Sequence, residues 1–206
     1  MSTSVMLKSL LIGAIMLLIS GLAYSQDTII RYKKPIVPDY LNFQYAGNVG
    51  AYVMGAGYVM NRKKNLEMVI SYGLSLPHHA ARRIHNISLK AVFLPVTFNL
   101  NKEWFLLLKT SLGLSRQFPE GSNTFTRLPK TFPDGYYAPN AYRGHLNLGA
   151  KIRKKLDERF FFKAIDFYAE TTTNDQYVMY LINSHHVGIN DIFSLSLGIN
   201  LYLYNK

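Results

Sequence analysis

Strict alternation of side-chain character near the C-terminal end is the feature that most limits what this chain can fold into. Between residues 192 and 204 one set of alternate positions is apolar: Phe193, Leu195, Leu197, Ile199, Leu201 and Leu203. The facing positions are small or polar: Ser194, Ser196, Gly198, Asn200 and Tyr202. A period of two indicates a β-strand, because successive side chains of a strand point to opposite faces. The segment therefore predicts a strand that separates an apolar environment from a polar one.

The same period recurs in six further runs, at residues 52–60, 66–76, 87–101, 104–115, 141–153 and 160–170. An eighth, shorter run covers residues 41–45 and is followed by a tight-hairpin signal at Gly47 and Asn48. About 9 to 11 residues suffice for a tilted strand to cross a bilayer, and single-chain bacterial barrels have an even number of strands. We therefore predict an all-β fold, a transmembrane up-and-down antiparallel β-barrel of eight strands.

Two of these runs are irregular. The 87–101 run changes phase near Ala91 to Phe93 and contains Pro95, which predicts a bulge or a poorly paired position. In the 160–170 run Lys163 falls among apolar positions, so that either a bulge intervenes or the lysine reaches toward the membrane interface.

The connections between the runs alternate in length. Residues 61–65, 101–103 and 154–158 are short and charged, whereas 77–86, 118–140 and 171–191 are long. Outer-membrane barrels have short periplasmic turns and longer extracellular loops, so this alternation predicts which end faces which side. Within the last long connection, residues 177–182 are apolar enough to touch the membrane surface or to extend the preceding strand.

Alternation alone leaves open whether the apolar face points outward to lipid or inward, as in a lipocalin-like secreted barrel. The polar face is rich in Gly, Ser and Asn, which suits the narrow lumen of an eight-stranded barrel better than a surface in water. Aromatic side chains also stand near the run ends, as in the interfacial girdles of membrane barrels: Tyr58, Tyr72, Trp104, Tyr142 and Tyr204. We therefore expect the apolar face to be the outer one.

The N-terminal residues resemble a secretory signal. Lys8 precedes an apolar run at residues 10–19, and the small residues Ala23 and Ser25 stand where cleavage is expected. We predict a cleaved signal peptide over residues 1–25, a periplasmic segment over 26–40 and the barrel over 41–206. The chain has no cysteine, so strand pairing and burial have to hold the exported domain together without disulfides.

In architecture, though not in any residue motif, residues 41–204 resemble the small eight-stranded outer-membrane barrels. These include OmpA-like proteins and lipid A acyl-modifying enzymes, and a leader ending Ser-Gln is typical of Bacteroidetes-type members. The resemblance implies an outer-membrane location, insertion by the barrel assembly machinery, and a structural or surface-interaction role. It also implies two alternatives, a lipid A hydrolase or transferase and a narrow channel.

The chain is basic, and loss of Lys8 with the leader leaves a formal charge of 22 − 12 = +10. Export argues against nucleic acid as the partner of these cations. Outer-membrane lipids and the phosphates of lipopolysaccharide are the expected partners for basic side chains on the surface. Cations placed in the turns and the lumen are the other explanation for the excess.

Charged and polar side chains on the predicted inner face are the first group of candidate functional residues. Charges in a narrow lumen need partners, so we expect a polar network that plugs the barrel or, alternatively, lines an ion path. Its expected members are Glu67, Lys109, Arg143, His145, Lys151, Asp166 and Glu170.

Loop and rim histidines are the second group. His85 with Ser88 and Glu170 is a candidate for a hydrolytic triad, but His85-Asn86-Ile87-Ser88 does not reproduce the His-x-Ser-Asn pattern of lipid A deacylases. His78, His79, His85, His185 and His186 would have to converge to bind zinc. Spacing alone assigns neither a metal nor a cofactor.

Overall fold

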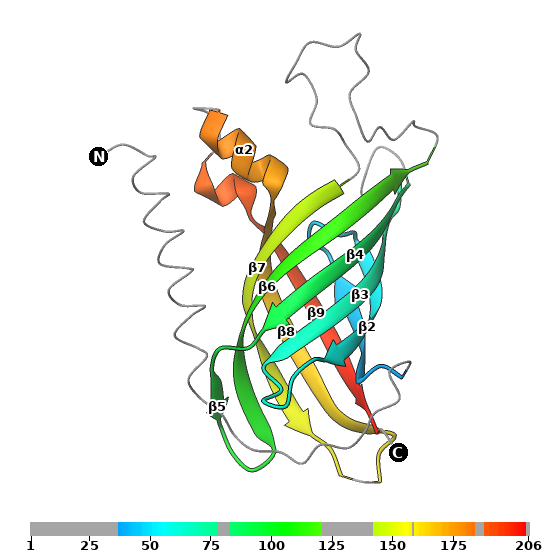
Figure 1. Cartoon of the computed structure of the whole chain (residues 1–206), viewed down its shortest axis with the longest axis vertical. Helices are drawn as coiled ribbons and strands as arrows, with labels where there is room; N and C mark the ends of the chain where they lie inside the picture. The colour runs from blue at the N-terminus through cyan, green and yellow to red at the C-terminus, as the bar shows by residue number, and fades with distance from the viewer. Residues whose placement is uncertain (1–36, 78–82, 121–141, 158, 184–187, 205–206) are drawn as a thin grey trace, which may run out of the picture.

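The computed structural model is a closed barrel of antiparallel strands (Figure 1). It describes residues 37–77, 83–120, 142–157, 159–183 and 188–204. The strands are β1 (Tyr40–Tyr45), β2 (Tyr52–Val59), β3 (Leu66–Ser75), β4 (Ile84–Phe93), β5 (Thr97–Asn99), β6 (Trp104–Pro119), β7 (Tyr142–Lys155), β8 (Phe162–Asn174) and β9 (Ser194–Leu203).

The barrel closes through two pairings besides the chain-order neighbours. β1 pairs with β9, and β4 pairs with β6, while the short β5 pairs with the far end of β6. Each of the eight long strands therefore has two partners, which satisfies its backbone hydrogen bonds on both sides. The predicted eight-stranded antiparallel barrel is confirmed.

Both predicted irregularities are bulges. Phe93 pairs with Thr110 and Thr97 with Leu107, so the β4–β5 side carries one residue more than β6 across this stretch. The register of β8 and β9 shifts in the same way around the exposed Lys163. The phase change of the 87–101 run was predicted slightly too early, because the apolar Val92 and Leu94 still point inward.

The two ends of the barrel differ in their connections. One end carries the short turns that precede β3, β6 and β8, and we call it the short-turn end. The other, the long-loop end, carries the long connections and two helices, α2 (Asp175–Asn183) and η2 (Ile189–Ile192), with α2 above β7 and β8 in Figure 1.

Of the two expectations for residues 177–182, extension of the strand is wrong, because these residues are part of α2. The side-chain oxygen of Asn174 accepts a hydrogen bond of 2.9 Å from the backbone nitrogen of Tyr177, which caps the first turn.

Within the described part of the chain, no helix is both long and apolar enough to cross a bilayer.

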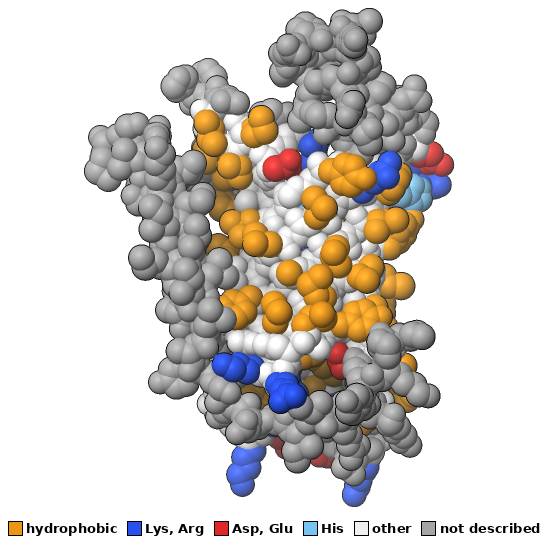
Figure 2. Space-filling model, viewed as in Figure 1, with side chains coloured by type: hydrophobic (Ala, Val, Ile, Leu, Met, Phe, Trp, Pro, Cys, Tyr) orange, Lys and Arg blue, Asp and Glu red, His pale blue; other side chains and the backbone are white. Residues whose placement is uncertain are grey.

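The barrel is polar inside and apolar outside. The buried side chains are mostly Asn, Gln, Ser, Thr and charged residues, whereas Met54, Leu112 and Leu195 on the outer face are 61%, 60% and 59% exposed. Figure 2 shows hydrophobic side chains spread over the visible wall between two ends that carry the charges. The lipocalin-like alternative, with its apolar face inward, is therefore wrong.

Two glycines make room for tyrosine rings inside the barrel. Gly57 lies opposite Tyr40 on β1, and Gly198 lies opposite Tyr168 on β8. A β-carbon on Gly198 would stand 2.2 Å from Tyr168 Cζ and 2.6 Å from the backbone oxygen of Phe43. Each ring thus lies against a stretch of wall without a side chain, an arrangement known as aromatic rescue of glycine.

We expect Gly198→Ala to destabilise the barrel by about 1–3 kcal/mol, because the added methyl group overpacks a filled interior. The measurement is the temperature at which the folded band is lost on a semi-native gel. Gly113→Ala is the matched control, since its nearest neighbour, the Leu89 oxygen, would lie at an ordinary 3.4 Å. Equal temperatures for the two variants would contradict the close packing of Tyr168.

Candidate functional site

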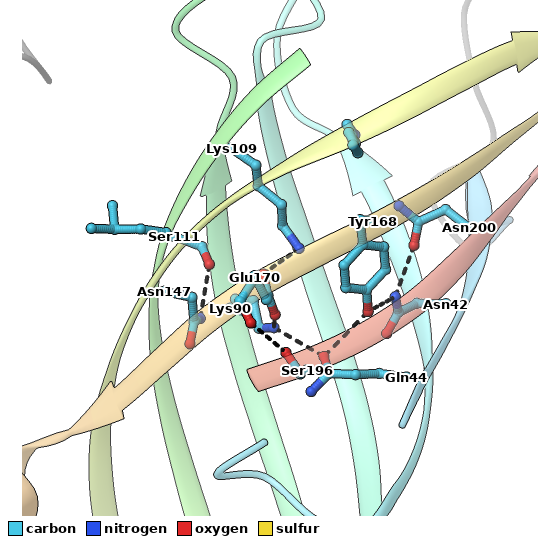
Figure 3. A network of polar contacts seen from close by, with 12 residues as sticks. Asn42, Gln44, Lys90, Lys109, Ser111, Asn147, Tyr168, Glu170, Ser196 and Asn200 are labelled. Atoms are coloured by element: carbon cyan, nitrogen blue, oxygen red, sulfur yellow. Dashed lines mark hydrogen bonds and ion pairs between the residues drawn. The ribbon is translucent and has the colours of Figure 1, made fainter. Parts of the chain in front are cut away.

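A cluster of polar side chains crosses the middle of the barrel (Figure 3). Glu170 on β8 binds two lysines, with its Oε1 2.8 Å from Lys90 Nζ and its Oε2 2.5 Å from Lys109 Nζ. The ammonium group of Lys109 also lies 3.9 Å from the centre of the Tyr168 ring. We call Glu170, Lys90, Lys109 and Tyr168 the central cluster.

The central cluster is tied to β1 and β9 by amide side chains. Gln44 Oε1 accepts hydrogen bonds from Tyr168 at 3.2 Å and from Lys90 at 3.4 Å. Asn42 donates to the Tyr168 hydroxyl and to Asn200 Oδ1, each at 2.8 Å. Strands β1, β4, β6, β8 and β9 are therefore cross-linked through the lumen by side chains alone.

A second cluster lies nearer the short-turn end. Lys151 Nζ is 3.0 Å from Glu67 Oε1 and 3.1 Å from Asp166 Oδ2. Arg153 binds Asp166 through two parallel hydrogen bonds of 2.7 and 2.9 Å. The hydroxyl groups of Tyr40 and Tyr202 donate to Glu67 at 2.9 and 3.0 Å. We call Glu67, Lys151, Arg153, Asp166, Tyr40 and Tyr202 the lower cluster. Its two cations pair with two carboxylates, so its formal charges balance.

Apolar side chains lie inside the barrel beside the lower cluster. Together with the rings of Tyr40 and Tyr202 they form one buried group, which comprises Val69, Val92, Leu94, Leu107 and Ala164. Water or an ion would find no polar partner along these side chains.

At the long-loop end, the β1–β2 turn folds inward over the lumen. Ala46 and Gly47 have φ angles of 62° and 91°, which reverse the chain, and Val49 is buried. Asn48 accepts a hydrogen bond of 3.1 Å from the Ser194 hydroxyl on β9. A β-carbon on Gly47 would stand 2.9 Å from Ser196 Cβ, so the turn lies directly against the inner wall.

The seven residues predicted for the lumen are all buried, and five of them belong to the two clusters: Glu67, Lys109, Lys151, Asp166 and Glu170. The other two make separate contacts. His145 Nε2 lies 2.6 Å from the Ser115 hydroxyl, and Arg143 Nη1 lies 3.9 Å from Asp175 at the start of α2.

The sequence interpretation missed two cations and the tyrosines. Lys90 precedes the phase change assigned to this run and alternates with Ile87 and Leu89, so the pattern itself places it on the inner face although it was left out of the predicted network. Arg153 lies on the same face as Lys151, two residues along β7. Pairing with Gly57 and Gly198 could have marked Tyr40 and Tyr168, but that pairing becomes visible only once the register is known.

The structure does not bring the hydrolytic candidates together. His85 lies on the outer face, where its Nδ1 bonds the Tyr72 hydroxyl, whereas Ser88 points inward and its hydroxyl lies 2.7 Å from that of Ser71. The carboxylate of Glu170 is paired with Lys90 and Lys109 and does not contact His85. Three positions apart on one strand means opposite faces of the wall, so His85 and Ser88 cannot act on one substrate.

Among the described residues, Ser115 and His145 are a hydroxyl group and an imidazole in hydrogen-bond contact, the pairing that a serine nucleophile and its base require. The Nδ1 of His145 is buried without a hydrogen-bond partner, so no carboxylate orients the ring as a triad requires. Among the described residues no group of three His, Asp or Glu side chains could hold a metal ion. His78, His79, His185 and His186 lie outside the described residues.

Comparisons with known proteins add no family to this geometry. A scan against protein-family models, a search of curated proteins and a search of solved structures each found no match to this chain.

Removing the carboxylate of Glu170 leaves two buried ammonium groups without a counter-charge. We expect Glu170→Gln to cost about 3–5 kcal/mol of unfolding free energy, as is typical when one partner of a buried ion pair is lost. Fluorescence of the single tryptophan, Trp104, follows denaturant unfolding in detergent.

Glu120→Gln is the control for this variant. It removes the same charge from an exposed pair with Arg83, at 3.6 Å, and should cost less than about 1 kcal/mol. Similar losses in both variants would show that the central cluster does not stabilise the barrel.

Proposed function

We propose that this protein is an integral outer-membrane β-barrel whose lumen is closed by its own side chains, with a structural or surface-interaction role. The observation that carries the proposal is the polarity of the wall, apolar outside and polar inside. A large outward apolar face has to be covered, and a lipid bilayer covers such a face on every side of a closed barrel.

The height of the apolar face supports this proposal. On β6 the outward leucines lie between Trp104 and Arg116, which are 116 − 104 = 12 residues apart. At a rise of about 3.3 Å per residue and a tilt of about 40°, the two residues differ by about 30 Å in height. The leucines between them therefore match an apolar band of about 25 Å, with one interfacial side chain beyond each edge.

The short-turn end carries a surplus of cations next to aromatic rings. Its described Lys and Arg residues are Arg62, Lys63, Lys64, Lys102, Lys154, Lys155, Arg159 and Lys163, against Asp39, Glu103 and Asp157. Lys154 lies 5.3 Å from the centre of the Trp104 ring. Partial burial lowers the pKa of Lys64, and repulsion by Lys163 lowers it further. Such a rim suits anionic lipid headgroups.

The closed lumen argues for a structural role rather than for conduction. Two ion clusters, the apolar group around Leu107 and the inward β1–β2 turn succeed one another along the interior. A passing ion would have to displace paired charges and then cross side chains that offer it no ligand.

Epitope-tagged protein is expected to co-fractionate with the outer membrane. It should also run faster on a gel before boiling than after, because a folded barrel stays compact in detergent. Purified mature protein that remained monodisperse in buffer without detergent would refute the membrane assignment.

In planar bilayers, the purified protein is expected to give no steady conductance steps, because its lumen is closed. A general porin in the same bilayer is the positive control for reconstitution. Reproducible unitary steps from folded protein would replace the structural role by that of a narrow channel.

A further inference from the structure

We propose that Arg116, at the upper edge of the outer wall, is a specific binding site for the phosphate group of a membrane lipid. This inference rests on the proposed membrane location, and it adds a defined ligand contact to it. Arg116 lies on the outer face of β6, since its cross-strand partners Ile87 and Tyr142 are 53% and 49% exposed there.

Two aromatic rings hold the guanidinium group of Arg116. Its central carbon lies 5.0 Å from the centre of the Phe118 ring and 5.3 Å from that of Tyr142. Rings at this distance attract a cation and restrict its side chain, so less conformational entropy is lost when a ligand binds. His85 lies directly across from Phe118 and adds a polar group to the same rim.

Arg116 differs from the other described arginines of the long-loop end in having no acidic partner among the residues that the structure describes. Arg83 lies 3.6 Å from Glu120, and Arg143 lies 3.9 Å from Asp175. In the described part of the chain no carboxylate lies within salt-bridge distance of Arg116, and its Nε is buried without a hydrogen-bond partner. Among the described residues the guanidinium group of Arg116 therefore has no anionic partner, and a planar fork of N–H groups is suited to binding a phosphate in two parallel hydrogen bonds.

The height of Arg116 on the wall indicates that its anion is a lipid phosphate. Arg116 stands about 30 Å above Trp104, just beyond an apolar band of about 25 Å, which is the level of lipid headgroups. Ile87 beside it, and Leu89 and Leu114 further toward the middle of the wall, are 53%, 46% and 55% exposed. A phosphate on Arg116 thus leaves the acyl chains of the same lipid on these side chains. Figure 2 shows Lys or Arg, His, and Asp or Glu side chains beside hydrophobic ones at the upper right of the wall.

The test uses the whole mature protein, folded in dodecyl maltoside, and native mass spectrometry during titration with phosphatidylglycerol. We expect Arg116→Gln to weaken binding of the first phosphatidylglycerol about tenfold, the size expected for losing hydrogen bonds to a charged group. Arg116→Lys keeps the charge but not the fork and should lose part of the affinity. Diacylglycerol, which lacks the phosphate, should bind wild type and Arg116→Gln equally weakly.

Arg83→Gln is the matched control, since it removes the same charge from the same rim where a carboxylate already pairs it; its affinity should stay within about twofold of wild type. Equal losses in Arg116→Gln and Arg83→Gln would overturn the site in favour of general charge attraction. If inorganic phosphate displaced phosphatidylglycerol at a concentration similar to that of the lipid, the site would bind free phosphate and not specifically a lipid.

Gel mobility before and after boiling verifies that each variant is folded. An unchanged affinity in folded Arg116→Gln, with the protein still dependent on detergent, refutes this site and leaves the proposed membrane role standing. Protein that is stable without detergent refutes the membrane role itself.

Discussion

The carboxylates of Glu170 and Glu67 each bind side chains from strands that are far apart in the sequence, through hydrogen bonds or ion pairs. An ammonium group in a narrow lumen is costly unless a carboxylate meets it, so each of these contacts is possible in only one register of the wall. A slip of one residue would turn the charged set toward the outside. The ion clusters thus link the closure of the barrel to the polarity of its two faces.

Packing around the clusters follows from the same narrowness. Tyr40 and Tyr168 can lie across the lumen only because Gly57 and Gly198 have no side chain opposite them. The apolar group around Leu107 then fills the space that the charges leave toward the short-turn end. At the two rims of the outer wall, Arg116 and Lys154 lie beside aromatic rings.

Alternation predicted most of the wall because it is a local property of each strand. It placed Glu67, Lys151 and Asp166 on the inner face and marked the irregularity at Lys163, for which a bulge was one of two explanations. It failed where tertiary packing changed the local pattern. Val92 and Leu94 are apolar yet inward, so the phase change lies later than predicted, and the apolar residues 177–182 belong to α2 instead of extending a strand.

The sequence by itself determined the number of strands that close the barrel, their faces and the types of residue inside, because these depend on period and composition. Only the tertiary structure decided which charges meet. Lys90 and Glu170 are 80 residues apart in the chain, and Tyr40 and Glu67 are 27 apart, so neither contact has a local signal. Likewise, His85 and Ser88 are close in sequence but separated by the wall, since strand geometry places positions three apart on opposite faces.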